Sequence, residues 1–213
     1  MTSEPSDGGR YEALNLAHGA SESDPFTVER YKQFYRHLPA GSIDVLDVGC
    51  NTGRGGQTLY ELDAALRIVG IDIVRDRIER LPSQYVDGLV ARTDHIPIAD
   101  HSFDAVLAGE VIEHLYSTDL NPTLAEFFRV LRLGGRLLLT TPNPNGAKRR
   151  ILRESVLGGP HVSQHFPRTL RMQLRATGFS RVRLRGSGKT TRYLHELAPL
   201  AAFGSYLAMA DKR

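Results

Sequence analysis

This chain has little of what marks secreted and membrane-spanning proteins. Among its 213 residues Cys50 is the only cysteine, so no disulfide can form within the chain. No apolar run approaches the roughly 20 residues that a membrane-spanning helix needs. The opening residues, MTSEPSDGGRYEAL, have neither a basic start nor an apolar stretch, so we expect no secretory signal there. Together these absences predict a cytoplasmic protein with no membrane partner.

Two phosphate-binding patterns are missing as well. The dinucleotide fingerprint GxGxxG does not occur, and neither does the phosphate loop GxxxxGK(S/T). Internal repeats and low-complexity linkers are also absent from the sequence. We therefore expect a single domain over residues 23–213, preceded by a polar tail at residues 1–22.

Positive charge is concentrated in one stretch of the chain. The net charge is only +3, but the segment from Lys148 to Arg192 is rich in arginine and has Glu154 as its only acid. Such a block can attract a polyanion or a phosphate-bearing substrate. Because the arginines are scattered and not interleaved with aromatics, as they are in single-strand binders, we favour solvated helix and strand faces.

Short apolar segments rich in β-branched residues alternate with stretches of helical periodicity. Strands are predicted at residues 43–49, 67–73, 87–91, 103–109, 135–142, 179–186 and 205–213. Helices are predicted from Ser23–Pro25 to about Leu38 and near residues 53–62, 75–81, 119–131 and 168–176. This alternation predicts an α/β fold, in which a doubly wound and mostly parallel sheet carries helices on both faces. Ligands of such sheets bind beyond the carboxyl ends of the strands.

The loop after the first strand, VLDVGCNTGRGG at residues 45–56, has features of a site for a nucleotide-like cofactor. Gly49 and Gly53 let the backbone approach a ligand closely, and a helix N-terminus with unpaired N–H groups follows. Asp47 beside the turn would repel a pyrophosphate, but it would suit a ligand with an ammonium and a sulfonium group.

Two more acids follow later strands. Asp72 ends the second strand, where a carboxylate can accept both hydroxyls of a ribose. Asp94 follows the third strand and could accept a hydrogen bond from an adenine amino group. One such acid alone would be better explained as the cap of a turn. Three acids at strand ends, together with the glycine loop, favour a cofactor site.

These patterns resemble class I S-adenosylmethionine-dependent methyltransferases. The matching stretches are DxGxxxG at 47–53, the acid at 72, TDHIPIADHSFDAV at 93–106 and RVLRLGGRLLLTTPNP at 129–144. The resemblance covers roughly residues 40–213. It implies a Rossmann-like sheet of seven strands whose last strand is antiparallel, and the strand count agrees.

The resemblance also implies roles for individual residues around S-adenosylmethionine. Asp47, Gly49 and Gly53 would contact the methionine end of the cofactor. The ribose and the adenine would be bound by Asp72 and Asp94, and the adenine ring would be flanked by His95 or Ile96.

Residues 109–115, GEVIEHL, place three polar side chains inside an apolar run. If the stretch begins a helix, Glu110, Glu113 and His114 lie on one face. They could bind a metal, act as acid and base, or form an ordinary solvated helix start, where acids are favoured. Many members of the resembled family carry ExxEH here without a metal. In that case Glu110 contacts the cofactor, while Glu113 and His114 line the substrate pocket.

A narrower resemblance points to a metal. The cation-dependent O-methyltransferases of ubiquinone biosynthesis and the small-RNA 2′-O-methyltransferases hold a divalent ion through ExxEH and a later histidine. The implied ligands here are Glu110, Glu113, His114 and one histidine of GGPHVSQHF, with Mg²⁺ as the first choice of metal.

The later histidine could be His161 or His165. We favour His165 because it precedes Phe166, as in the related pattern HFxPxxL, although one residue between Phe and Pro is missing here. The catalytic candidates are Glu113, His114 and His165, and a histidine that is not a ligand would be the general base.

The resemblance extends to actinobacterial saccharide O-methyltransferases, such as the mannoside methyltransferases of methylmannose polysaccharide synthesis. We therefore expect an O-methyltransferase that acts on a small-molecule or oligosaccharide acceptor. The alternatives are a metal-free methyltransferase of a phenolic or other small metabolite, an RNA 2′-O-methyltransferase and a non-catalytic binding protein. Nucleic acid is not the expected partner, because a separate RNA-binding domain is lacking. Residues 194–207 could line an apolar patch or a homodimer contact, or form the last helix on the sheet.

Overall fold

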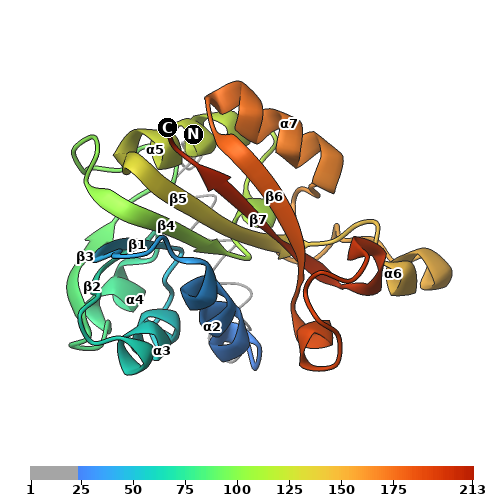
Figure 1. The fold of residues 1–213 in the computed structure, drawn as a ribbon, viewed down its shortest axis with the longest axis horizontal. Helices are drawn as coiled ribbons and strands as arrows, with labels where there is room; N and C mark the ends of the chain where they lie inside the picture. The colour runs from blue at the N-terminus through green and yellow to red at the C-terminus, as the bar shows by residue number, and fades with distance from the viewer. Residues whose placement is uncertain (1–23) are drawn as a thin grey trace, which may run out of the picture.

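A seven-stranded sheet forms the centre of the computed structural model, which describes residues 24–213 (Figure 1). The strand order is β3-β2-β1-β4-β5-β7-β6. Neighbours from β3 to β5 pair in parallel, whereas β7 is antiparallel to both β5 and β6. This confirms the predicted Rossmann-like α/β sheet with an antiparallel last strand. The predicted tail at residues 1–22 lies outside the described residues.

The strands are β1 (Asp44–Val48), β2 (Arg67–Asp72), β3 (Tyr85–Val90), β4 (Phe103–Gly109), β5 (Leu131–Pro142), β6 (Ser180–Ser187) and β7 (Ser205–Asp211). The α-helices are α2 (Thr27–His37), α3 (Arg54–Leu62), α4 (Arg75–Glu79), α5 (Leu120–Val130), α6 (Ala147–Leu152) and α7 (Pro167–Thr177). Three 3-10 turns are η2 (Ile112–His114), η3 (Lys189–Arg192) and η4 (Leu200–Ala202). Within this described part, no helix has the length and apolarity to span a membrane.

Apolar residues fill both faces of the sheet. Successive strand residues point to opposite faces, so Leu46 of β1 joins the core cluster under α5 and α7, while Val45 joins the cluster under α2 and α3. Figure 1 shows these two helix layers on either side of the sheet. The near-continuous apolar runs of β1 and β4 follow from this burial on both faces.

The structure differs from the sequence-based predictions in three features. GEVIEHL does not begin an α-helix, because only Ile112–His114 form a 3-10 turn and the chain then becomes extended. Helix α6 was not predicted, since its residues are exposed and show no apolar periodicity. The last-helix interpretation of residues 194–207 is wrong, because η4 is a single turn before β7.

The strand order reverses between the neighbouring strands β1 and β4. From β1 it runs outward through β2 to β3, and then returns to β4 on the other side of β1. Loops that leave neighbouring strands on opposite faces open a crevice at such a point. The fold therefore places a ligand site beyond the ends of β1 and β4.

Candidate active site

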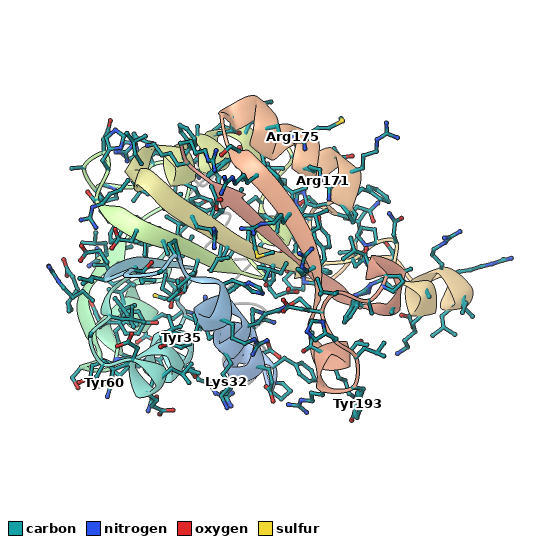
Figure 2. All side chains as sticks on the ribbon, in the orientation of Figure 1. Lys32, Tyr35, Tyr60, Arg171, Arg175 and Tyr193 are labelled. Carbon is teal, nitrogen blue, oxygen red and sulfur yellow. The ribbon has the colours of Figure 1, made fainter. Side chains whose placement is uncertain are left out.

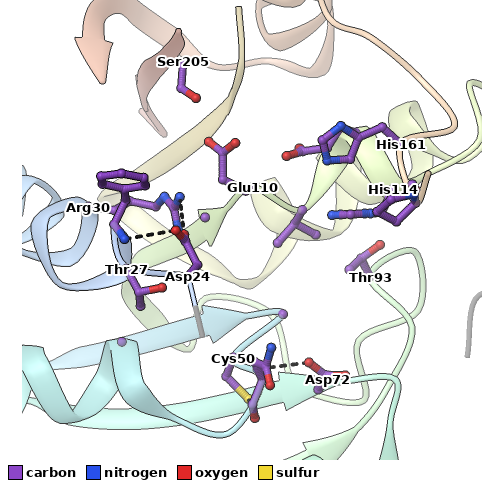
Figure 3. Close-up of a pocket in the computed structure, with 18 of the residues that line it drawn as sticks. Asp24, Thr27, Arg30, Cys50, Asp72, Thr93, Glu110, His114, His161 and Ser205 are labelled. Atoms are coloured by element: carbon purple, nitrogen blue, oxygen red, sulfur yellow. Dashed lines mark hydrogen bonds and ion pairs between the residues drawn. The ribbon is translucent and has the colours of Figure 1, made fainter. Parts of the chain in front are cut away.

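A cavity of about 660 Å³ lies at this reversal point. Its volume falls within the range of about 300–1,000 Å³ that is usual for small-molecule sites. Its walls come from the ends of β1, β2 and β4, from the chain after β3 and from the start of α2. The β5–β6 and β6–β7 connections complete them. Figure 3 shows Asp72 and Cys50 at one end of the cavity and His114 and His161 beside each other at another.

The glycine loop after β1 turns sharply against the end of β2. Gly49 has φ +65°, and a Cβ there would lie 2.8 Å from Val111 Cγ2. Its N–H donates to the Ile71 carbonyl at 2.8 Å. Gly49 lines the cavity, but Gly53 does not. A Cβ on Gly53 would instead lie 2.4 Å from Pro82 Cδ, so this glycine, at φ +82°, permits the turn into α3 and close packing behind it.

Asp47 lies beneath the loop and does not contact the cavity, which corrects its predicted contact with the methionine end. The side chain is fully buried, and its two carboxylate oxygens accept hydrogen bonds of 2.5 Å from the Tyr31 and Tyr85 hydroxyls. Burial raises the pKa of Asp47 to about 6, against the lowering effect of the two phenols. The residue ties α2, β1 and β3 together below the cofactor loop.

Asp72, the predicted ribose acceptor, lines the cavity at the end of β2. One carboxylate oxygen accepts the Asn51 N–H at 3.0 Å, and the other accepts the Val74 N–H at 2.9 Å and approaches Arg77 at 3.5 Å. These contacts fix the orientation of the carboxylate. Each oxygen has two lone pairs, so the group can accept ligand hydroxyls in addition.

Asp94 also lines the cavity, in a two-pronged ion pair with Arg92 at 2.8 and 2.6 Å. The hydrogen-bonded Arg92 lowers the pKa of Asp94. The predicted ring neighbours His95 and Ile96 do not line the cavity. Ile96 is buried in the core, with its N–H bonded to Glu126 at 2.7 Å.

The apolar wall beside Asp94 comes from residues that were not predicted. Ile73 and Ala91 line the cavity there, directly after β2 and β3. Arg30 of α2 also lines it, under Gly109, where an added Cβ would lie 2.9 Å from Arg30 Cδ. No local pattern links α2 to the end of β4, so only the fold reveals this contact.

Glu110 and Glu113 bring two carboxylates to the end of β4. Glu110 adopts φ +57°, and its N–H bonds to the Thr140 carbonyl at 3.0 Å. Glu113 is fully buried and accepts the Thr141 hydroxyl at 3.0 Å. Among residues 24–213, no hydrogen-bond partner is present for one buried oxygen of each glutamate. Burial, together with the charge of Glu110, raises the pKa of Glu113 well above its usual range.

Glu113, His114 and His161 offer ligand atoms that lie within 4.8 Å of one another. The centroids of the two imidazole rings are 5.0 Å apart. Nδ1 of His114 lies 3.1 Å from the Pro160 carbonyl, and Nδ1 of His161 lies 3.1 Å from the Val156 carbonyl. Because a carbonyl can only accept, both Nδ1 atoms carry the proton, which makes Nε2 the acceptor in each neutral ring. Backbone carbonyls orient metal-binding imidazoles in this way.

His165 lies elsewhere, which corrects the preference for it over His161. Its Nε2 donates to the Ile112 carbonyl at 3.0 Å and contacts the Ser163 hydroxyl at 3.0 Å. The side chain is buried behind the 3-10 turn and does not line the cavity. Burial lowers the pKa of His165, so the ring stays neutral and structural.

The basic block at residues 148–192 is spread over several elements. Its members lie on α6, α7, β6 and η3. Figure 2 shows Arg171 and Arg175 on α7 at one edge of the molecule and Tyr193 at the opposite edge. The block is therefore distributed over several elements and does not occupy the face of one helix or strand.

Comparisons with known proteins agree with this architecture. Residues 46–139 match the family model of a methyltransferase domain. A "Probable S-adenosylmethionine-dependent methyltransferase" of Mycolicibacterium smegmatis is 37% identical over 118 residues, which are 54% of this chain and 44% of that protein. A malonyl-[acyl-carrier protein] O-methyltransferase of Methylococcus capsulatus is 29% identical over 180 residues, which are 78% of this chain and 65% of that protein. The chain thus spans less than two thirds of either relative.

A solved structure supports the fold over nearly the whole chain. The SAM dependent methyltransferase from Archaeoglobus fulgidus superposes with a TM-score of 0.73 at 19% identity, covering 94% of this chain and 99% of that one. The sheet order and the superposition show that the chain has the seven-stranded fold of this methyltransferase, and residues 46–139 are similar to a methyltransferase domain.

Proposed function

We propose that this protein transfers the methyl group of S-adenosylmethionine to a hydroxyl oxygen of a saccharide, assisted by a divalent metal. The observation that carries the proposal is the group formed by Glu113, His114 and His161, which shares one cavity with Gly49 and Asp72. An acceptor bound at this group would lie at the end of β4, next to the cofactor. Transfer to oxygen is supported by the relative named as an O-methyltransferase.

The donor set fits a divalent cation. Glu113 has a buried oxygen without a partner, and Glu110 brings a second one into the same cavity. Arg30 offsets part of the negative charge of this buried carboxylate pair, and a bound cation would offset more of it. Carboxylates with imidazoles suit Mg²⁺, Mn²⁺, Zn²⁺ or Fe²⁺, and we take Mg²⁺ as the first choice. When bound, such an ion polarises a hydroxyl and lowers its pKa.

The protein's own residues would orient the reactants. Asp72 would hold the ribose hydroxyls of the cofactor, and Asp94 would receive the adenine amino group. The glycine loop would bring the backbone close to the methionine end. A saccharide with neighbouring hydroxyls suits a site of this kind because two oxygens can chelate one ion. His114 would accept the hydroxyl proton where it is not a ligand.

A metal-free methyl transfer to a phenolic or other small metabolite is the second candidate. It is favoured by the burial of Glu113 and its closeness to Glu110, which raise the pKa of Glu113 and so favour its neutral form when no cation is near. Glu113 would then remain a neutral wall of the acceptor pocket, and His114 would accept the hydroxyl proton as the methyl group passes from the sulfonium to the oxygen.

A methyl-transfer assay separates the two candidates. S-adenosylhomocysteine release is measured with a panel of mono- and oligosaccharides and a panel of phenols, before and after EDTA treatment and after Mg²⁺ or Mn²⁺ is restored. The proposal expects turnover with a saccharide that EDTA abolishes and the metal restores. Turnover that EDTA leaves unchanged would overturn the metal, and turnover only with phenols would overturn the saccharide.

A further inference from the structure

Two cations in the cavity wall have neither a carboxylate partner nor a side-chain hydrogen bond in the described part of the chain. The lysine and arginine residues that line the cavity are Arg30, Arg54, Arg77, Arg92, Arg149 and Lys189. Ion pairs join Arg30 to Asp24, Arg77 to Asp72 and Arg92 to Asp94. Arg54 donates to the Asp24 carbonyl at 3.2 Å, at the start of α3 on the cofactor side. The charges of Arg149 and Lys189 remain without a neutralising carboxylate within ion-pair distance.

The guanidinium group of Arg149 has an unsatisfied hydrogen-bond donor. Its Nε is buried and has no hydrogen-bond partner. A buried guanidinium N–H that nothing accepts is costly, so such a group in a cavity wall indicates a missing acceptor. The neighbouring Arg150 on the same helix is exposed and does not line the cavity.

The sheet brings Arg149 and Lys189 to the same edge. Pro142 at the end of β5 pairs with Ser205 at the start of β7, and Ser187 at the end of β6 pairs with the same Ser205. The chain that follows β5 and the chain that follows β6 therefore leave the sheet together. Arg149 lies on the first and Lys189 on the second.

This edge lies away from the residues expected to hold the ribose. In Figure 3, Ser205 and His161 lie away from Cys50 and Asp72, and Glu110 lies between Ser205 and His161 in this view. The strand edge from which the segments of Arg149 and Lys189 depart therefore lies away from the ribose end of the cavity.

We propose that the acceptor carries an anionic oxygen group, a phosphate or a carboxylate, that binds Arg149 and Lys189. The proposal rests on the proposed function, because it names the class of acceptor for the same site. The guanidinium fork of Arg149 can hold two oxygens of either group, and Lys189 adds a point charge. Glu110 and Glu113 repel an anion, so the charged end of the acceptor points to Arg149 while its hydroxyl meets the metal-binding group. The acceptor is thus an acidic or phosphorylated sugar.

The test is calorimetric titration of the full chain, loaded with S-adenosylhomocysteine, with inorganic phosphate and separately with malonate. Arg149→Gln should weaken anion binding by about tenfold or more, and Lys189→Gln should weaken it by a smaller factor. Arg150→Gln is the matched control and should bind the anion like the wild type. Titration of S-adenosylhomocysteine itself should be unchanged in all three variants.

Each outcome of these titrations either supports or overturns the proposed anion-binding role of Arg149 and Lys189. Binding of phosphate alone assigns a phosphoryl group, binding of malonate alone assigns a carboxylate, and binding of both assigns an oxyanion subsite of either kind. No binding of either anion, or equal losses in Arg149→Gln and Arg150→Gln, overturns the proposal. If the wild type fails to bind S-adenosylhomocysteine, the proposed function falls, and the same anion titrations on the cofactor-free protein still judge the subsite.

Discussion

Replacing Asp47 with asparagine should remove a specific pH dependence of the free energy of unfolding. Asp47 is fully buried against two tyrosine hydroxyls, and its pKa is raised from 3.8 to about 6. The folded state therefore keeps the proton to higher pH than the unfolded state does. The stabilising contribution is fully present below about pH 4, falls as the pH rises through about 6, and is constant above that.

The magnitude follows from linkage. A shift of about two units between the unfolded and folded states corresponds to a loss of about 3 kcal/mol from acid to neutral pH. About 2 kcal/mol of this falls between about pH 4.5 and pH 7.5. The amide in Asp47→Asn has nearly the shape of the carboxyl group and does not titrate, so the free energy of unfolding of this variant lacks the contribution. Other titrating groups cancel when the two proteins are compared at the same pH values.

Urea unfolding of the wild type and of Asp47→Asn, at about pH 4.5 and about pH 7.5, measures the effect. The wild type should lose about 2 kcal/mol more than the variant does between the two pH values. The reasoning assumes that burial outweighs the two phenol hydrogen bonds, which favour the carboxylate. If the hydrogen bonds win, the wild type becomes more stable relative to the variant as the pH rises, and the assignment is refuted.

Three further predictions concern the binding of ligands. Asp72→Asn should weaken S-adenosylhomocysteine binding by roughly 100-fold in calorimetry, because the charged acceptor of the ribose hydroxyls is lost, whereas the exposed control Asp76→Asn should bind normally. Asp47→Asn should lower the same affinity less than Asp72→Asn does, because Asp47 does not reach the cavity; an equal loss would contradict its placement. RNA binding measured at low salt should be absent or weak, since the basic residues at 148–192 lie on separate elements, and a strong, salt-sensitive shift would favour the RNA alternative.

Local patterns were enough to predict the sheet, because its strands are buried on both faces and have a distinct composition. β1 and β4 are apolar runs that end in glycine turns, and the acid at Asp72 follows directly from a strand end. Boundaries were less certain where elements join without a turn. β5 begins at Leu131, directly after α5, and so starts earlier than the predicted residue 135.

Contacts between distant segments could not be predicted from sequence. Asp47 looked like a cofactor contact because its partners, Tyr31 and Tyr85, lie on α2 and β3. The choice between His161 and His165 depends on which way a loop turns, and a bridge between Gly158 and His161 sets that direction. Arg149 looked like one member of a scattered basic block until the end of β5 placed it in the cavity wall.

We propose above that Glu113, His114 and His161 hold a divalent metal ion. The most direct test is calorimetric titration of Mg²⁺ and Mn²⁺ into the protein loaded with S-adenosylhomocysteine, for the wild type, Glu113→Gln, His161→Asn and His165→Asn. We predict binding to the wild type and to His165→Asn, and loss of binding in Glu113→Gln and His161→Asn. Metal binding that survives His161→Asn but is lost in His165→Asn, or no binding to any of the four proteins, would contradict the account.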